Sequence, residues 1–251
     1  MHKDTLPTIF APKRRRAGWR RLVSRQHRDN AAVWMLDDAI DEIIERMAFM
    51  RFVPESTLVV GDWTGKLARH LIAEGCSVVS QGIGEIDEEQ PFGDMQFDAI
   101  VHLLGMGTLN DLPGALLHCR NALKDDGLLF SAFPGAGTLL QLRQIMLAAD
   151  GAQPAARIHP MIDQKAAAAL MQRAGFRKQV IDSQSLIVRF SSLNQLIDDL
   201  RDQGMGNMLR DPGPYVKPSQ WRAAKQKFSQ LADADGKLKE TFEMITLTGW
   251  K

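Results

Sequence analysis

The segment from Thr57 to Gly65 constrains the fold of this chain more than any other, because a glycine turn joins a strand to a helix there. It reads Thr-Leu-Val-Val-Gly-Asp-Trp-Thr-Gly. The apolar run that ends at Val60 is typical of a strand buried on both faces, and we expect a helix from about Thr64 to Glu74. This order is typical of the first strand–helix unit of a doubly wound nucleotide-binding sheet, in which turn glycines let backbone N–H groups approach a ligand.

Three positions of this unit depart from the pattern of a working nucleotide site. Val59 stands near the strand end, where an acidic residue is expected, and Trp63 replaces a glycine in the middle of the turn. Gln81 and Gly82 fall about twenty residues after the turn, where a carboxylate normally binds a ribose diol. We therefore expect the scaffold of a cofactor pocket, with the indole of Trp63 in the volume that the ligand would need.

The turn residues themselves have two interpretations. Gly61 and Gly65 either bind a cofactor or only keep the strand–helix turn tight, and the bulk of Trp63 favours the second interpretation. Asp62 and Thr64 are expected to cap the following helix, because Asp and Thr side chains accept hydrogen bonds from its free N–H groups.

Composition predicts one large α/β domain, since 251 residues with 45% hydrophobic side chains bury a substantial core. The net charge of +1 gives no overall field that attracts nucleic acid. The charge is nevertheless uneven: residues 1–30 carry nine Lys or Arg and two acids, which leaves the remainder net negative by about six.

Compartment and metal content are predicted from the same composition. No apolar run approaches the roughly 18 residues of a membrane span, and the basic start lacks the apolar region of a secretory signal. Cys76 and Cys119 have no metal-type spacing, so we expect two reduced, partly buried thiols and no metal site. We expect a bacterial cytoplasmic protein, with the mitochondrial matrix as the alternative because the arginine-rich start resembles a transit peptide.

The order of elements predicts a helical start followed by an α/β domain. Residues 1–52 are expected to form a basic arm and an amphipathic, lid-like helix, and residues 53–251 the α/β domain, with a helical insertion at about 191–236. We expect helices over 13–28, 30–50, 112–122, 138–149, 163–174, 192–203 and 220–232. The expected strands are 57–60, 77–80, 97–103, 128–133, 176–182, 186–190 and 241–250, with a turn at 124–127.

The expected strands include one strand fewer than a complete half of a doubly wound nucleotide-binding sheet contains. Only the sixteen residues 81–96 separate the second strand from the third, and they are rich in Gly, Pro and acids. A right-handed crossover alone takes a dozen or more residues. We therefore expect that a helix and an edge strand are absent, and with them the floor of an adenosine pocket.

Beyond these patterns, the chain resembles class I S-adenosylmethionine-dependent methyltransferases. Within them it is most similar to the branch that contains the complex I assembly factors and the biotin-pathway carboxyl methyltransferases. The resemblance runs along nearly the whole chain and rests on short motifs in order. They are the arginine-rich start before Asp29-Asn30-Ala31-Ala32, Gln90-Pro91-Phe92 before Phe97-Asp98, Leu109 to Pro113, Leu123 to Gly127, Gly137-Thr138-Leu139 with Leu142-Arg143, His159-Pro160, Arg173 to Phe176, and Gly249-Trp250-Lys251.

The resemblance implies a Rossmann-like sheet of seven strands, mostly parallel with a terminal antiparallel hairpin, here with one strand fewer. It also implies S-adenosylmethionine as cofactor and modification of a protein, or a role in respiratory complex I assembly. Several positions depart from the family pattern by losing charged or hydrogen-bonding side chains. A His-Trp pair becomes Gly107-Thr108, an acid becomes Gly137 and a Glu becomes Gln141.

Two hypotheses follow. In the first, the chain is an active enzyme: Gly61, Asp62, Trp63, Gly65, Gln81 and Asp87 line the cofactor, and Asn110, Arg143 and His159 orient the substrate. No catalytic base can be named, although methyl transfer needs mainly alignment of the reactants. In the second, which we favour, the chain is a degenerate member that acts as a protein-binding or assembly factor. The tryptophan in the turn and the missing crossover both damage the same pocket, which indicates that the pocket is no longer required to bind a cofactor.

The basic arm, residues 14–28, has two interpretations of equal weight. It either grips an acidic protein partner or an anionic surface such as a membrane, or it packs over the cleft as a solvated lid. Trp19 and Trp34 flank it without the repeated aromatic spacing that nucleic-acid stacking favours, so a nucleic-acid partner is not expected.

Overall fold

The protein is described here by a computed structural model, and the structure describes residues 8–251; the first seven residues of the predicted arm lie outside this range. One sheet of six strands organises the described chain, in the order β2-β1-β3-β4-β6-β5. Its strands are β1 (Ser56–Val60), β2 (Ser77–Gln81), β3 (Phe97–Leu103), β4 (Leu123–Pro134), β5 (Arg177–Phe190) and β6 (Leu238–Trp250).

The first four strands are parallel, and β6 runs antiparallel between β4 and β5. This arrangement confirms the Rossmann-like sheet with a terminal antiparallel hairpin. It also confirms the missing strand, because β2 lies at the edge of the sheet and residues 82–96 contain neither strand nor helix.

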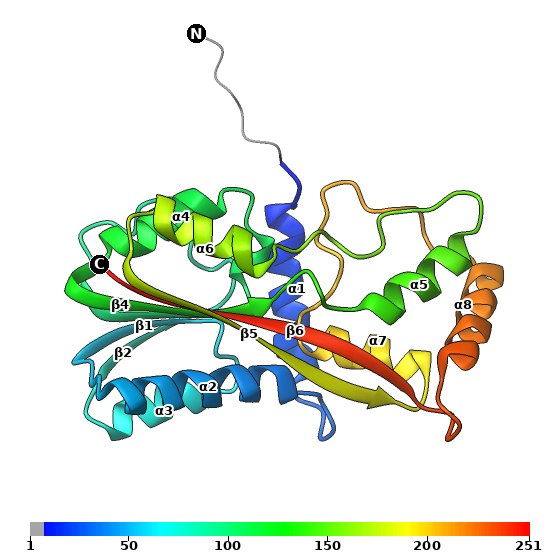
Figure 1. Cartoon of the computed structure of the whole chain (residues 1–251), viewed down its shortest axis with the longest axis horizontal. Helices are drawn as coiled ribbons and strands as arrows, with labels where there is room; N and C mark the ends of the chain where they lie inside the picture. Colours follow the sequence, from blue (N-terminus) through cyan, green and yellow to red (C-terminus); the bar gives the residue numbers. More distant parts are fainter. Residues whose placement is uncertain (1–7) are drawn as a thin grey trace, which may run out of the picture.

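Helices cover both faces of the sheet (Figure 1). On one face, α2 (Trp34–Met50) and α3 (Lys66–Ala73) pack on Val59, Val101 and Phe130. On the other, α4 (Leu112–Asn121) and α6 (Gln164–Arg173) pack on Ile100 and Leu129. The alternation of side chains along each strand thus separates two apolar layers.

The long strands β5 and β6 project beyond the parallel part of the sheet, and a second group of helices surrounds their projecting ends (Figure 1). This group contains α5 (Leu140–Asp150), α7 (Leu193–Asp202) and α8 (Pro218–Leu231). The projecting residues Phe190, Leu238 and Phe242 are fully buried among these helices. Both α7 and α8 lie between β5 and β6 in the chain, as the expected insertion does.

Two expectations about the strands are wrong. Residues 176–190 form one strand instead of two, because β6 pairs with β5 without a break from Val180 to Phe190. The polar residues in its middle are held by partners on both faces: Ser183 Oγ donates to Glu243, and Gln184 Nε2 donates to Asp38. Residues 124–127, expected as a turn, lie within β4 as an irregularity in its pairing with β3.

Helix boundaries also differ from expectation. The helix after the first turn starts at Lys66, not at Thr64. Asp62 Oδ2 accepts from the Ala68 N–H and Thr64 Oγ1 accepts from the Lys66 N–H, so both side chains do cap the helix. The basic arm forms α1 (Pro12–Arg25), and α2 starts at Trp34 instead of Asn30.

Gly61 offers a direct test of why this turn needs glycine. Its φ is +92°, and a Cβ atom there would clash with the carbonyl oxygen of Leu103 on β3. Gly75 has a similar φ of +88°, but a Cβ atom there would meet nothing within 4 Å.

We expect Gly61→Ala to lower the free energy of unfolding by about 3 kcal/mol, because strain and a backbone clash add together. Gly75→Ala should lower it by only about 1 kcal/mol, from the strained φ alone. Urea denaturation of the two variants measures the difference; equal losses would show that the contact with β3 does not constrain the turn.

Candidate functional site

Helix α1 lies across the carboxyl ends of β1, β2 and β3, where a doubly wound sheet binds its ligands (Figure 1). It buries Arg15, Gly18 and Leu22 toward the sheet. Its Trp19 ring packs edge-on against Trp63 with centroids 6.2 Å apart. A Cβ atom at Gly82, the residue after β2, would clash with the Trp19 indole. The arm therefore fills the cleft with its own side chains.

A buried ion pair fixes the middle of α1. Arg15 Nη1 and Nη2 donate to the two carboxylate oxygens of Glu88, each at 2.7 Å, and Arg15 Nε donates to Thr108 Oγ1 at 3.1 Å. Glu88 Oε1 also lies 3.0 Å from His102 Nε2 at the end of β3. Both side chains of the ion pair are almost fully enclosed, with 7% and 1% exposure. The short loop that replaced the missing crossover thus supplies the anchor for the arm.

The surroundings of Glu88 shift its pKa strongly. Burial alone raises the pKa, but the hydrogen bonds with Arg15 and His102, together with the positive charge of Arg15, lower it to about 2. The carboxylate is therefore ionised at neutral pH and holds α1 electrostatically.

Both ends of the arm are tied down as well. Asn110 Oδ1 accepts from the backbone N–H groups of Ile9 and Phe10, both at 2.8 Å, and its Nδ2 donates to the Phe10 carbonyl. At the other end, Arg25 Nε donates to Asp202 Oδ1 at 2.6 Å, and Arg28 pairs with the same carboxylate. Three separate anchors hold α1 on the cleft.

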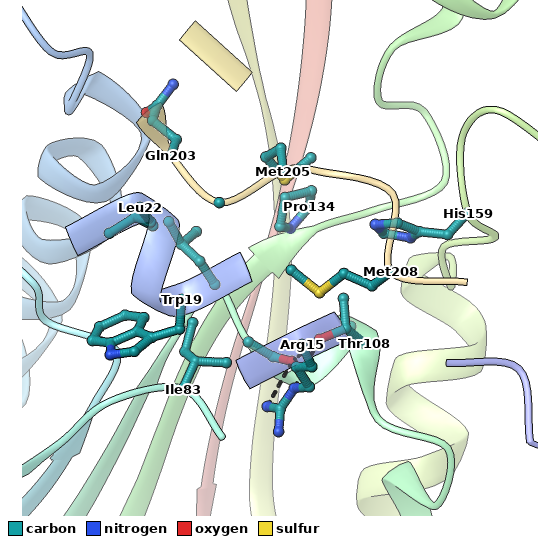
Figure 2. Close-up of a pocket in the computed structure, with 14 residues that line it drawn as sticks. Arg15, Trp19, Leu22, Ile83, Thr108, Pro134, His159, Gln203, Met205 and Met208 are labelled. Atoms are coloured by element: carbon teal, nitrogen blue, oxygen red, sulfur yellow. Dashed lines mark hydrogen bonds between the residues drawn. The ribbon is translucent and has the colours of Figure 1, made fainter. Parts of the chain in front are cut away.

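Two hollows remain beneath the helix. One of about 150 Å³ lies between its first turn and residues 84–89. The cavity between α1 and the carboxyl ends of β3 and β4 measures about 30 Å³. Figure 2 shows Arg15, Trp19 and Leu22 entering it from α1, opposite Thr108, Pro134 and His159. This volume suits one or two water molecules, whereas small-molecule sites measure roughly 300–1,000 Å³. In this arrangement both hollows are smaller than that range.

The residues predicted to line a cofactor occupy the expected strand ends, and most have structural partners. Gly61 N–H donates to the Gln81 carbonyl, and Gly65, with φ +69°, precedes α3. Trp63 is half-buried against the apolar layer under α2, with its buried indole N–H lacking an acceptor among residues 8–251. Asp87 is exposed on the loop and accepts from the Glu89 N–H. Their role toward a cofactor stays a prediction.

The three predicted substrate residues come from three separate segments, and two of them, Asn110 and His159, both contact Phe10. Asn110 binds the start of the arm, as described above. His159 is buried beside Phe10, with ring centroids 5.5 Å apart, and it lines the cavity. Burial lowers its pKa, with a further contribution from the positive charge of Arg143 on α5, so the imidazole is neutral at pH 7. Their role toward a substrate also stays a prediction.

Sequence reasoning did not identify Arg15 and Glu88 as a pair. Arg15 is one of four consecutive basic residues, and Glu88 is the middle of three consecutive acids, so neither stands out by type. The two residues lie 73 positions apart, which leaves no local spacing to detect.

Neither a metal site nor a disulfide is formed by the residues that the structure describes. Groups of three or more His, Cys, Asp or Glu with metal-binding geometry do not occur among them. Cys76 and Cys119 are free thiols that are buried, not partly buried as expected, and burial raises the pKa of Cys119 well above its usual range. Within residues 8–251, every helix is too short or too polar to cross a membrane.

Comparison with known proteins establishes the family. A methyltransferase-domain model matches residues 32–180, more than half of the chain, so the protein belongs to the methyltransferase-domain family. Its fold and relatives indicate the class I S-adenosylmethionine-dependent type. The crystal structure of the [4+2]-cyclase SpnF superposes with a TM-score of 0.53 over 99% of both chains at 15% identity, which supports the fold alone.

Two relatives represent different named activities. Malonyl-[acyl-carrier protein] O-methyltransferase 1 of Coxiella burnetii is 29% identical over 231 residues, which cover 85% of this chain and 80% of the relative. The mitochondrial arginine-hydroxylase NDUFAF5 of Mus musculus is 30% identical over 172 residues, 66% of this chain. The aligned part spans about half the length of NDUFAF5.

The lowered pKa of Glu88 predicts acid sensitivity. A carboxylate with a folded-state pKa of about 2 and a usual value of 4.5 stabilises the fold fully above about pH 4.5. That stabilisation, about 3 kcal/mol, is lost as the pH falls from 4.5 toward 2. We expect Glu88→Gln to lower the free energy of unfolding at pH 7 by about 3–5 kcal/mol, because it leaves Arg15 buried without its counter-charge.

The matched control is Asp87→Asn, which neutralises the adjacent exposed acid. Denaturant titrations at pH 7, 4.5 and 3 should show a smaller acid-induced loss for Glu88→Gln than for the wild type and Asp87→Asn. Parallel losses in all three proteins would contradict the assigned role of the ion pair.

Proposed function

We propose that this methyltransferase-fold protein is a degenerate member of its family that acts as a protein-binding or assembly factor, of the kind that serves respiratory complex I, and that it does not bind S-adenosylmethionine. The observation that carries the proposal is the position of α1. Trp19 packs on Gly82 and Trp63, at the ends of β2 and β1, where the family's cofactor would lie.

The anchors of α1 support a closed state rather than a loose lid. Arg15 and Glu88 are buried as a hydrogen-bonded ion pair, and removing either partner would leave an uncompensated charge. To enter the cleft, a cofactor would have to displace Trp19. If α1 moved as a whole, the ion pair between Arg15 and Glu88 would also have to separate. Such a ligand would spend much of its binding free energy on opening the cleft.

The outward face of the same helix supports a binding role. Four basic residues on it are exposed, and none forms an ion pair with residues 8–251: Lys13, Arg14, Arg20 and Arg21. With the remainder of the chain net negative, this face is a localised positive surface. An acidic segment of a protein partner is the complementary surface.

The alternative is an active S-adenosylmethionine-dependent methyltransferase, favoured by the similarity to malonyl-[acyl-carrier protein] O-methyltransferase 1 over 85% of the chain. In that case Gly61, Asp62, Gly65, Gln81 and Asp87 would contact the cofactor after α1 moves away. Asn110, Arg143 and His159 would then become available to a substrate.

Thermal-shift titration with S-adenosylmethionine distinguishes the proposed assembly factor from the active methyltransferase. A ligand at one hundred times its Kd would stabilise the folded state by about 2.7 kcal/mol and raise the Tm by roughly 5–11 °C. We expect no shift for the wild type. The double variant Trp19→Ala, Trp63→Gly should gain a shift, because it empties the volume that the two indoles fill.

Trp221→Ala, in α8 and remote from the cleft, is the control and should show no shift. A shift in the wild type would refute the proposal and favour the enzyme. A double variant that folds but binds no cofactor would show that the indoles are not what excludes it.

The partner-binding part is tested by crosslinking mass spectrometry in cells that express the tagged chain. Arg20→Glu, Arg21→Glu should abolish crosslinks between α1 and its partner, because like charges then face each other. Arg222→Glu, Lys225→Glu on the exposed side of α8 is the matched control and should leave them intact. Crosslinks that survive both charge reversals, or involve no respiratory-complex subunit, would contradict the assembly role.

A further inference from the structure

We propose that the groove enclosed by α5, α7, α8 and residues 205–218 is a second binding site, for a single-chain amphiphile with an anionic carboxylate or phosphate head. Two adjoining hollows form it, an outer one of about 610 Å³ and an inner one of about 170 Å³. They adjoin, because they share six lining residues: Leu142, Arg157, Ile158, Ile197, Arg201 and Asn207.

The groove runs inward from the surface toward the cleft under α1. Its inner part shares His159 and Met205 with the 30 Å³ cavity there. Its outer part opens beside Tyr215, which is 91% exposed. The site is therefore distinct from the filled cofactor cleft and reaches it only at its closed end.

Apolar side chains from every enclosing element line the groove. Leu142 and Met146 come from α5, Ile197 from α7 and Trp221 from α8, and Ile158 and Val216 come from the connecting segments. Volumes of this size are typical of small-molecule sites. A large outer hollow that adjoins a smaller inner one, both with apolar walls, fits a flexible hydrocarbon chain better than a compact polar ligand, because contacts with the apolar walls supply the binding free energy.

Charge at the groove selects the head group. Arg157 is already neutralised: its Nη2 and Nε donate to the two oxygens of Asp150, at 2.7 and 3.1 Å, and its Nη1 donates to the Pro214 carbonyl. Arg201 differs, because its side chain is 60% exposed and lies 3.4 Å from Asp198 Oδ1. That oxygen also accepts from Arg25 at 3.1 Å. Arg201 thus presents a cation that is only partly compensated, on the wall of an apolar groove.

Binding is tested with the full chain and two matched series, alkanoates and alkyl phosphates of eight to fourteen carbons, each compared with the neutral alkanol of equal length. Calorimetry gives the affinity, and tryptophan fluorescence reports the site when wild type and Trp221→Phe are compared. We expect about fourfold tighter binding per added CH₂ until the groove is filled. The two anionic series distinguish a carboxylate head from a phosphate head by their relative affinities.

Two variants locate the ligand. Arg201→Ala should weaken binding of the anionic series about twofold to fivefold and leave the alkanols unchanged, whereas Arg222→Ala on the outer side of α8 should change neither. Ile197→Trp should remove the chain-length dependence by filling the junction of the two hollows. An affinity independent of chain length, or equal effects of Arg201→Ala and Arg222→Ala, would overturn the proposal. So would concentration-dependent dimerisation in ultracentrifugation without amphiphile binding, since the groove would then be a protein contact.

Discussion

The docking of α1 on the carboxyl edge of the sheet is the constraint on which the rest of this structure depends. It joins residues far apart in the chain through one buried ion pair, Arg15 with Glu88, and His102 extends that pair to the end of β3. A buried charge pair is favourable only when hydrogen bonds satisfy it on all sides, and the guanidinium here also contacts Thr108 and the Gly105 carbonyl. The arm is thereby part of the folded domain and occupies the family's ligand-binding edge.

The missing crossover explains how this arrangement is possible. A complete sheet half would place a helix and strand after β2, whereas residues 82–96 return directly to β3 as an irregular loop. That loop brings Gly82 under Trp19 and Glu88 under Arg15. The short loop and the docked arm are therefore structurally linked, because the loop supplies the residues on which α1 packs. The apolar groove on the other side of His159 is enclosed by α5, α7 and α8, and α7 is itself tied to α1 through Arg25 and Asp202.

The sequence was sufficient for the sheet, because its signals are local. The apolar run ending at Val60, the turn at Gly61 and the shortness of residues 81–96 predicted the parallel core and the missing strand. Sequence reasoning failed where strand pairing determines the structure: residues 183–185 look like a break between two strands, yet pairing with β6 keeps them in one strand.

The candidate site was harder to predict from the sequence than the sheet. Trp63 was predicted to occupy the cofactor volume; in the structure its ring packs against Trp19, 44 positions earlier in the chain, and no periodicity links the two. Asn110 was assigned to a substrate, but its amide binds the arm, a contact that only the docked arm reveals.

Hydrogen–deuterium exchange over α1, with and without S-adenosylmethionine, tests the closed cleft most directly. If the helix is an integral part of the fold, its amides exchange as slowly as those of β1 and β3, since both open only on global unfolding, and saturating cofactor changes neither. Fast exchange in residues 12–25 of the free protein, or a change in their protection on adding the cofactor, would contradict the account.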